Sequence, residues 1–213
     1  MAKRKRPGQP GGVRDTNRKA RKEALLDASL RLFLEHGIEG VSVDDITTKA
    51  KMAKGSFYRY FESQAALVAE MIEPTRAIVT EALEQCSREL NTASTRDAQF
   101  AAYAKIGDVI GTVFLEHPGV VRLYLQENRA PAVGARKPIV QLSDVISRYA
   151  IEITKKAQKH GILRPIPEAI SALAVVGAAE RLLHGIMLEE DIGNPLEVPK
   201  HLATLILDGL KAQ

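Results

Sequence analysis

Apolar side chains recur three and four residues apart along most of the chain, whereas the strict alternation typical of a half-buried strand is nearly absent. This periodicity predicts an all-α protein with about nine helices. Breaks at Gly, Pro and capping residues place two short helices after Ser42, the second of them carrying Phe57 and Phe61. The other helices are expected at about 18–36, from 63 onward, and at 96–116, 118–128, 139–160, 168–190 and 198–211.

Local signals mark the ends of the first helices. Gly37 follows the first helix and predicts a stop at a positive φ angle. Ser42, with Asp45 three residues later, predicts a capping box at the start of the second helix. Pro74 cannot donate a hydrogen bond to the carbonyl of Glu70, so we expect the helix that begins near Ser63 to kink or break there.

The expected helix lengths divide the chain into three parts. Residues 1–17 are a basic leader rich in Gly and Pro, which favours a flexible segment. Residues 18–62 form a small domain of short helices, and residues 63–213 form a larger helical bundle. The chain has 30 Lys and Arg against 26 Asp and Glu, and residues 1–22 hold nine of the cations against Asp15 alone. This charge at one end favours a polyanionic partner, although a merely solubilising tail remains an alternative.

The second and third short helices suit a helix-turn-helix that enters the DNA major groove. The third helix presents groups that bind phosphates or base edges. Lys54 supplies charge, and Arg59 can pair with guanine or with the DNA backbone. Gly55 lets the protein backbone approach a DNA strand closely. The candidate DNA-binding residues are Ser42, Lys54, Gly55, Ser56, Tyr58, Arg59 and Tyr60. Spacing alone leaves open a helical hairpin whose aromatic residues only pack in a core.

The run from Gly37 to Leu67, GIEGVSVDDITTKAKMAKGSFYRYFESQAAL, resembles the DNA-binding segment of tetracycline-repressor (TetR) family regulators. It includes that family's small-x-x-Tyr-x-Tyr-Phe pattern, and the overlap extends through about residues 18–70. The resemblance implies that Ser42 caps the second helix and touches a phosphate. It also implies that Lys54 to Ser56 open the recognition helix, and that Tyr58 and Tyr60 hold the DNA backbone, with Arg59 near the bases.

Two positions depart from the family pattern. Lys51 replaces the glycine usual in the turn, and a side chain is disfavoured at positive φ. Gln64 replaces the lysine usual at the start of the fourth helix and so removes a cation that pairs with phosphate. Lys3 to Arg6 are candidates for a minor-groove contact. Asp44 lies beside the expected DNA surface, where its charge repels phosphate and favours the dipole of the second helix.

The resemblance implies that the larger half holds an effector pocket and a dimer interface. Helical spacing marks a stripe that either lines a cavity or is ordinary core, and the candidates are Tyr103, Ile106, Ile110, Phe114, Tyr124, Tyr149 and His184. Glu180 and His184 lie four residues apart and are expected to pair. The helix at 168–190 is apolar nearly all round, so a second copy of the chain is expected to cover one side. The candidate dimer contacts are Gly177, Ala178, Leu202, Leu205 and Ile206.

An enzyme is the main rival class of function, and the sequence gives it little support. The five histidines are scattered, no His-Glu-x-x-His or Gly-x-Ser-x-Gly run occurs, and no metal site or cofactor is expected. The single cysteine, Cys86, fits a reducing cytosol and is expected to be inert. The longest apolar run has eleven residues, at 169–179, so we expect no membrane span and a cytoplasmic protein. We interpret the chain as a dimeric, ligand-responsive repressor of a palindromic DNA site, with a non-switching DNA-binding protein as the alternative.

Overall fold

The computed structural model describes residues 12–209, and every regular element in that range is helical, which confirms the predicted all-α fold. The leader residues 1–11 and residues 210–213 lie outside the described range. The helices are α1 (Val13–His36), α2 (Val43–Lys49), α3 (Lys54–Phe57), α4 (Gln64–Leu90), α5 (Arg96–Glu116), α6 (Pro118–Glu127), α7 (Lys137–Lys159), α8 (Glu168–Met187) and α9 (Val198–Thr204). Two 3₁₀ turns, Gly134–Arg136 and Pro195–Glu197, precede α7 and α9, and Leu205–Gly209 is a π-helical turn.

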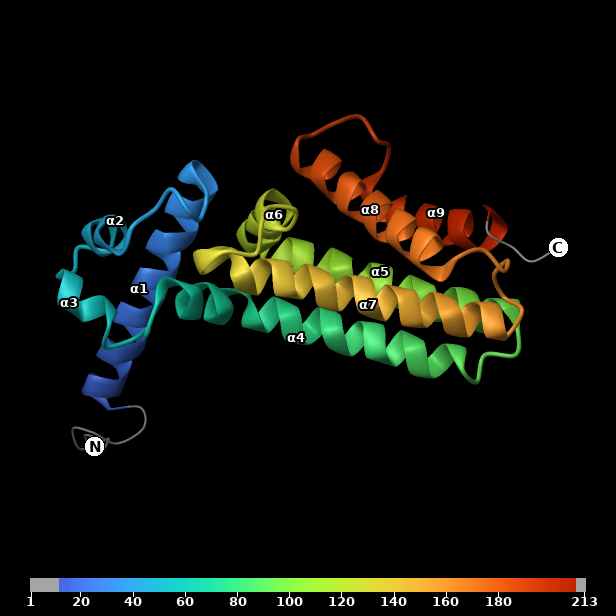
Figure 1. Cartoon of the computed structure of the whole chain (residues 1–213), viewed down its shortest axis with the longest axis horizontal. Coiled ribbons are helices and arrows are strands. Elements are labelled where there is room, and N and C mark those ends of the chain that lie inside the picture. The colour runs from blue at the N-terminus through green and yellow to red at the C-terminus, as the bar shows by residue number, and fades with distance from the viewer. Residues whose placement is uncertain (1–11, 210–213) are drawn as a thin grey trace, which may run out of the picture.

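The helices form two groups that meet at α6. In Figure 1, α1, α2 and α3 lie at one end of an elongated molecule, and the long helices α4, α5 and α7 run side by side away from them. Helix α8 lies across the other side of α7, and α9 packs on α5. Helix α6 contacts α1 on one side and α5 and α8 on the other, so it lies between the two groups.

The predicted signals at the first helices are present in the structure. Gly37 ends α1 at φ 74°, and its amide donates to the carbonyl of Phe33. The capping box at α2 is complete, because the Asp45 amide donates to Ser42 Oγ and the Ser42 amide donates to the Asp45 carboxylate. Helix α1 begins at Val13, five residues earlier than predicted, so 13–17 are helical rather than part of a flexible leader. The Gly and Pro residues that disfavour a helix end at Gly12 in the sequence, which explains why α1 begins at Val13.

Of the kink or break predicted at Pro74, the break does not occur, because α4 continues from Gln64 to Leu90 with the proline inside it, and a kink there stays a prediction. Pro74 still cannot donate to the carbonyl four residues earlier. Tertiary packing offsets this loss, since Met71, Ile72 and Thr75 beside the proline are all buried. Helix α4 is therefore one continuous element shared by both groups of helices.

The core of the small domain crosses the boundary predicted between residues 62 and 63. Phe33, Ile46 and Phe57 from the first three helices are fully buried in one cluster with Leu67 of α4 and Leu123 of α6. A second cluster occupies the far end of the bundle and includes Cys86 of α4. Burial raises the pKa of the Cys86 thiol to about 12, which agrees with the expectation of an inert thiol.

Helix α8 has a longer apolar stretch than the eleven-residue run counted in the sequence. It is long and apolar enough, by length and composition, to cross a membrane, and only 17% of its most apolar window is buried within the described chain. The apolar run counted from the sequence stops at Ala179, whereas an 18-residue apolar window of this helix extends across Glu180 and Arg181. Length therefore does not by itself exclude a span, and the exposed side of α8 needs an apolar cover.

Lys51, in the turn between α2 and α3, adopts a φ of 54°, so the turn has a left-handed residue there although a side chain disfavours it. A left-handed conformation costs a residue with a side chain about 1–2 kcal/mol, whereas glycine adopts it freely at a smaller entropic cost. We therefore expect Lys51→Gly to raise the free energy of unfolding by about 1 kcal/mol, measured by urea denaturation at fixed protein concentration. Lys49→Gly, in the last turn of α2, is the matched control and should lower it by about 1 kcal/mol. Equal losses in both variants would contradict the left-handed turn.

Candidate functional site

The surface of α2 and α3 gathers the predicted DNA-binding side chains at one end of the molecule. Phe57 and Phe61 are buried against the core, and this places the opposite face of α3 toward solvent. Tyr58 is 58% exposed, and its ring lies edge-on to Phe57 at 5.4 Å between centroids. An ideal Cβ built on Gly55 meets nothing within 4 Å, so α3 is open to close approach there.

Lys54, the first residue of α3, forms an ion pair with Asp44. Lys54 Nζ donates to the Asp44 carboxylate at 2.6 Å, and this hydrogen bond raises the pKa of Lys54. The pair joins the first turns of α2 and α3 across an exposed surface. Asp44 therefore does more than interact with the dipole of α2, since it orients the amine that would meet a phosphate.

The other predicted DNA-binding residues are partly engaged within the chain. Arg59 donates to Ser56 Oγ at 3.0 Å, and Tyr60 packs against the core cluster. Ser42 Oγ donates to Asp45 at 2.6 Å, and this contact and the backbone hydrogen bond lower the pKa of that carboxyl group. Contacts with DNA stay predictions for all of these residues.

Gln64, at the start of α4, forms hydrogen bonds with the loop between α1 and α2. Its amide nitrogen donates to the carbonyl of Val41 at 2.8 Å, and the carbonyl of Ile38 lies at 3.5 Å. The side chain thus holds the loop between α1 and α2. This contact explains why an amide is accommodated at a position where the resemblance led us to expect a lysine.

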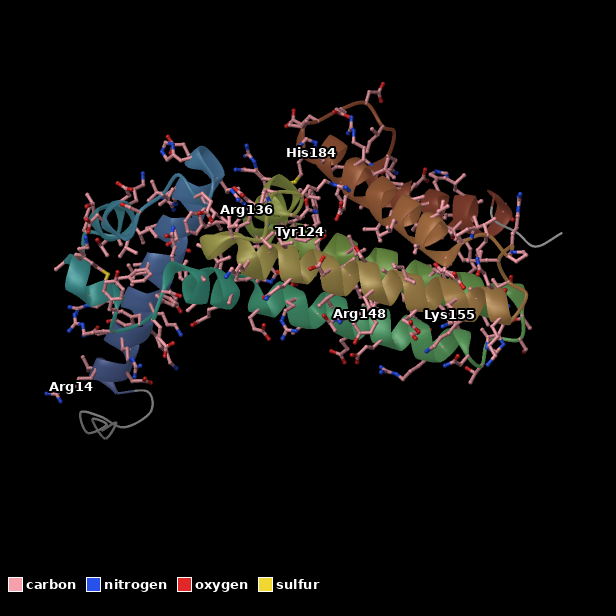
Figure 2. All side chains as sticks on the ribbon, viewed as in Figure 1. Arg14, Tyr124, Arg136, Arg148, Lys155 and His184 are labelled. Carbon is pink, nitrogen blue, oxygen red and sulfur yellow. The ribbon has the colours of Figure 1, made fainter. Side chains whose placement is uncertain are left out.

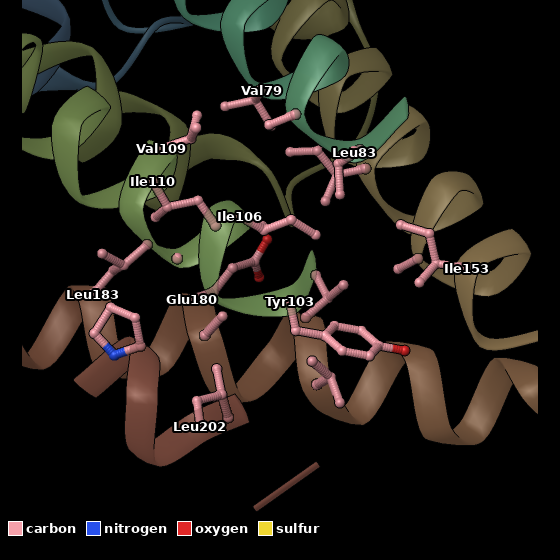
Figure 3. A pocket seen from close by; sticks show the side chains of 18 of the residues that line it. Val79, Leu83, Tyr103, Ile106, Val109, Ile110, Ile153, Glu180, Leu183 and Leu202 are labelled. Carbon is pink, nitrogen blue, oxygen red and sulfur yellow. The ribbon is translucent and has the colours of Figure 1, made fainter. Parts of the chain in front are cut away.

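The larger half holds a partly open cavity of about 220 Å³ between α4, α5, α6, α7, α8 and α9. Its wall consists mostly of Ile, Leu, Val and Ala side chains, as Figure 3 shows. Gly107 on α5 permits the close approach of α9, because a Cβ there would lie 2.4 Å from Pro199 Cβ. The cavity is apolar and of a size to hold a small organic molecule.

The predicted pocket residues divide into two sets. Tyr103, Ile106, Ile110 and Tyr124 line the cavity. Phe114, Tyr149 and His184 are not among the residues that line it, so the structure does not bring these three together with the others. Tyr149 instead donates to Glu84 on α4 at 2.5 Å, and His184 lies on the exposed side of α8 (Figure 2). Helical spacing identified Tyr103, Ile106 and Ile110 on α5, but it did not give the direction of Phe114 near the end of that helix or of Tyr149 and His184 on other helices.

Glu180 is the residue that the sequence analysis missed as part of the cavity. Its Oε1 accepts hydrogen bonds from the Tyr124 hydroxyl at 2.8 Å and from Asn128 at 2.9 Å, and its Oε2 accepts one from Arg129 at 2.7 Å. The predicted pairing with His184 is therefore replaced by three contacts with α6 and the residues just after it. Burial raises the pKa of Tyr124 to about 12, so its hydroxyl keeps the proton that it donates.

A second buried carboxylate joins α6 to the small domain. Glu127 Oε1 accepts a hydrogen bond from the backbone amide of Ile38 at 3.0 Å, and Oε2 accepts one from Arg136 at 2.6 Å. The two side chains are 5% and 14% exposed. Figure 2 shows Arg136 and Tyr124 beside α6. Helix α6 and the residues after it thus contact the cavity carboxylate and also the loop that precedes α2.

Four of the five predicted dimer residues, Ala178, Leu202, Leu205 and Ile206, border one apolar groove, and Gly177 does not. Leu205 is 63% exposed, and it borders this groove with Ile170 and Ala178. Ile206 is buried and Leu202 packs on the second core cluster, so both serve the chain's own core. Gly177 lies beneath Arg129, since a Cβ there would be 3.8 Å from the guanidinium nitrogen. The exposed apolar side chains of α8, Ile170 and Leu173, were not in the predicted set.

Comparison with known proteins agrees with this geometry. Residues 25–71 match the family model of bacterial regulatory proteins of the tetR family. The HTH-type transcriptional regulator YuxN of Bacillus subtilis is 29% identical over 113 residues, covering 53% of this chain and 37% of YuxN. The HTH-type regulator Rv1556 of Mycobacterium tuberculosis is 26% identical over 81% of this chain and 76% of its own length.

A solved structure extends the likeness over the whole fold. SmeT, the repressor of the Stenotrophomonas maltophilia multidrug efflux pump SmeDEF, matches with a TM-score of 0.65 and 18% identity. The match covers 89% of each chain. At this identity the comparison shows that the two proteins share a fold.

The buried link at Glu127 predicts a large energetic effect. Glu127→Ala leaves Arg136 without its carboxylate and the Ile38 amide without its acceptor, so we expect a loss of about 3–5 kcal/mol in the free energy of unfolding. Urea denaturation at fixed protein concentration measures it. Glu73→Ala, which removes an exposed ion pair with Arg76, is the matched control and should move the midpoint little. A small effect at Glu127 would contradict the buried link.

Proposed function

We propose that the chain is a cytoplasmic, ligand-responsive transcriptional repressor, because residues 25–71 match the model of the tetR family of bacterial regulatory proteins and the chain shares the fold of the repressor SmeT. It binds a palindromic operator as a homodimer, and a small molecule in the cavity releases it. The observation that carries this proposal is the placement of the exposed α3 surface and the cavity at opposite sides of α6.

The α3 surface supplies the DNA contacts. Tyr58 and Arg59 are exposed, and Lys54 lies beside them at the first turn of the helix. Phenol, guanidinium and ammonium groups all donate to phosphate oxygens, and a guanidinium also donates to guanine. Lys54 exchanges the Asp44 carboxylate for a phosphate when DNA binds.

The contacts of α6 couple the two sites. A molecule that enters the cavity meets Glu180, which holds Tyr124 and the residues after α6. Movement of that end of α6 reaches Glu127 and, through its hydrogen bond, the amide of Ile38 ahead of α2. An effector that binds better to one position of α6 therefore shifts the population of DNA-competent dimers.

The exposed apolar side of α8 and the π turn supplies the dimer contact. Ile170, Leu173 and Leu205 are 65%, 47% and 63% exposed, an amount of apolar surface that favours association. A second copy covers it with the same residues under two-fold symmetry. The two α3 surfaces then read the two halves of a palindrome.

The test of this proposal is sequence-specific, effector-sensitive DNA binding by the purified protein. A site selected from random DNA should be palindromic and bound about 10³-fold more tightly than unrelated DNA. The double variant Lys54→Ala/Tyr58→Phe should lose this binding in an anisotropy titration. Lys105→Ala/Tyr149→Phe makes the same replacements in the larger half and should bind as the original protein does. Equal retention by both variants, or a monomer at micromolar concentration, would overturn the proposal.

Removal of the Asp44 charge should strengthen DNA binding. Asp44→Asn releases Lys54 from its ion pair and removes a negative charge beside the phosphates, so we expect a three- to tenfold gain in affinity, on the order of 1 kcal/mol. The slope of log affinity against log salt should steepen by about one phosphate contact. Asp108→Asn, an exposed position on α5, changes net charge equally and should leave affinity unchanged. Weaker binding by Asp44→Asn would show that its carboxylate contributes to recognition.

A further inference from the structure

The cavity combines an apolar wall with a single carboxylate. Among the described residues that line it, Glu180 is the only charged side chain, and the other polar ones carry neutral hydroxyl groups. Figure 3 shows the Glu180 carboxylate directed into the space beside Ile106, whereas the hydroxyl of Tyr103 points away from it. Glu180 is therefore the main polar group that a ligand can contact in this part of the cavity.

The hydrogen bonds of Glu180 leave acceptor capacity in the cavity. Its Oε1 accepts from Tyr124 and Asn128, whereas Oε2 accepts only from Arg129. An ionised carboxylate has about four lone-pair sites, so Oε2 can accept one further hydrogen bond. The Tyr124 hydroxyl uses its proton on Glu180, and its oxygen interacts with the side chains of Ser143 and Asn128. This end of the cavity therefore complements a donor rather than an acceptor.

The charge distribution disfavours an anionic ligand. Arg129, which offsets the charge of Glu180, does not line the cavity, and its side chain is 74% exposed. Glu180, in contrast, is 13% exposed and borders the apolar space. A second negative charge placed there would lose its hydration and be repelled by Glu180 in a medium of low dielectric constant.

The cavity volume limits the size of the ligand. An apolar cavity of about 150 Å³ holds benzene, and this cavity has about 220 Å³. One ring with a short apolar substituent fits this space without enlarging it. The substituent would meet Leu183 and Ile110, which also line the wall.

We propose that the cavity binds a monocyclic, mostly apolar molecule whose single hydrogen-bond donor, a phenol or an amine, is directed at Glu180, and that it rejects carboxylates of the same skeleton. This proposal rests on the proposed function in that the bound molecule is the effector. Glu180 is then a specificity-determining residue, because its charge separates donors from anions on an otherwise apolar wall.

Calorimetry with three matched ligands tests the ligand class. The series is 4-propylphenol, 4-propylanisole and 4-propylbenzoate at pH 7.5, which present a donor, an acceptor and an anion on one skeleton. We expect the phenol to bind about tenfold more tightly than the anisole, the difference made by one hydrogen bond to a charged group. The benzoate should bind most weakly. Tighter binding of the benzoate, or no binding of the phenol at millimolar concentration, would overturn the proposal.

Three variants assign the selectivity to Glu180. Glu180→Gln keeps the shape and an acceptor but removes the charge, so the benzoate should gain affinity and the preference for phenol over anisole should shrink several-fold. Leu183→Ala is the control on the same helix and should weaken all three ligands while leaving their ratios unchanged. Arg129→Gln should leave the benzoate the weakest ligand. If the benzoate binds tightly to the original protein and loses that affinity in Arg129→Gln, the cavity recognises an anion through Arg129 instead.

Operator binding measured with the same ligands separates this proposal from the proposed function. Release of DNA by the benzoate but not by the phenol would overturn the ligand class while the repressor function stands. Tight binding of the phenol without any change in DNA affinity would leave the ligand class in place and overturn the effector role. Release by the phenol, lost together with phenol selectivity in Glu180→Gln, supports both.

Discussion

The hydrogen bond from the Ile38 amide to the buried carboxylate of Glu127 is the contact on which the arrangement of the two halves depends. A carboxylate with 5% exposure is tolerated in a core only when its oxygens are occupied, and Arg136 and the Ile38 amide occupy both. Because one partner follows α1 and the other precedes α7, the orientation of the small domain is fixed by this residue of α6 as well as by apolar packing.

The polar contacts of the chain differ in their energetic weight according to burial. The Asp44–Lys54 pair is more than half exposed on both sides, so it contributes little to stability and is readily exchanged for a phosphate. The Glu127–Arg136 pair is shielded on both sides, so breaking it leaves an uncompensated group in a low dielectric, whereas Arg129, the partner of Glu180, is 74% exposed. The surface proposed to meet DNA is therefore adaptable, whereas the Glu127 contact at α6 is firm.

The apolar side chains of the larger half lie in three kinds of position. Residues such as Leu83 and Ile153 fill the core between the long helices and also border the cavity. Others, such as Ile106 and Leu183, face the empty space that we assign to an effector. A third set on α8, including Ile170 and Leu173, faces outward, where we propose the dimer contact. The same residue types thus fill the core, line the cavity and face solvent, and position alone distinguishes them.

The sequence by itself determined the features that are encoded locally. These are the all-α class, the bounds of α5, the capping box at Ser42 and the end of α1 at Gly37, since each depends on residues within one or two helical turns. Only the tertiary structure decided which side chains reach the cavity, why Glu180 contacts α6 rather than His184, and how α4 continues through Pro74. These outcomes depend on the crossing of helices distant in sequence, and the periodicity of one helix gives its apolar face but not the neighbour that the face meets.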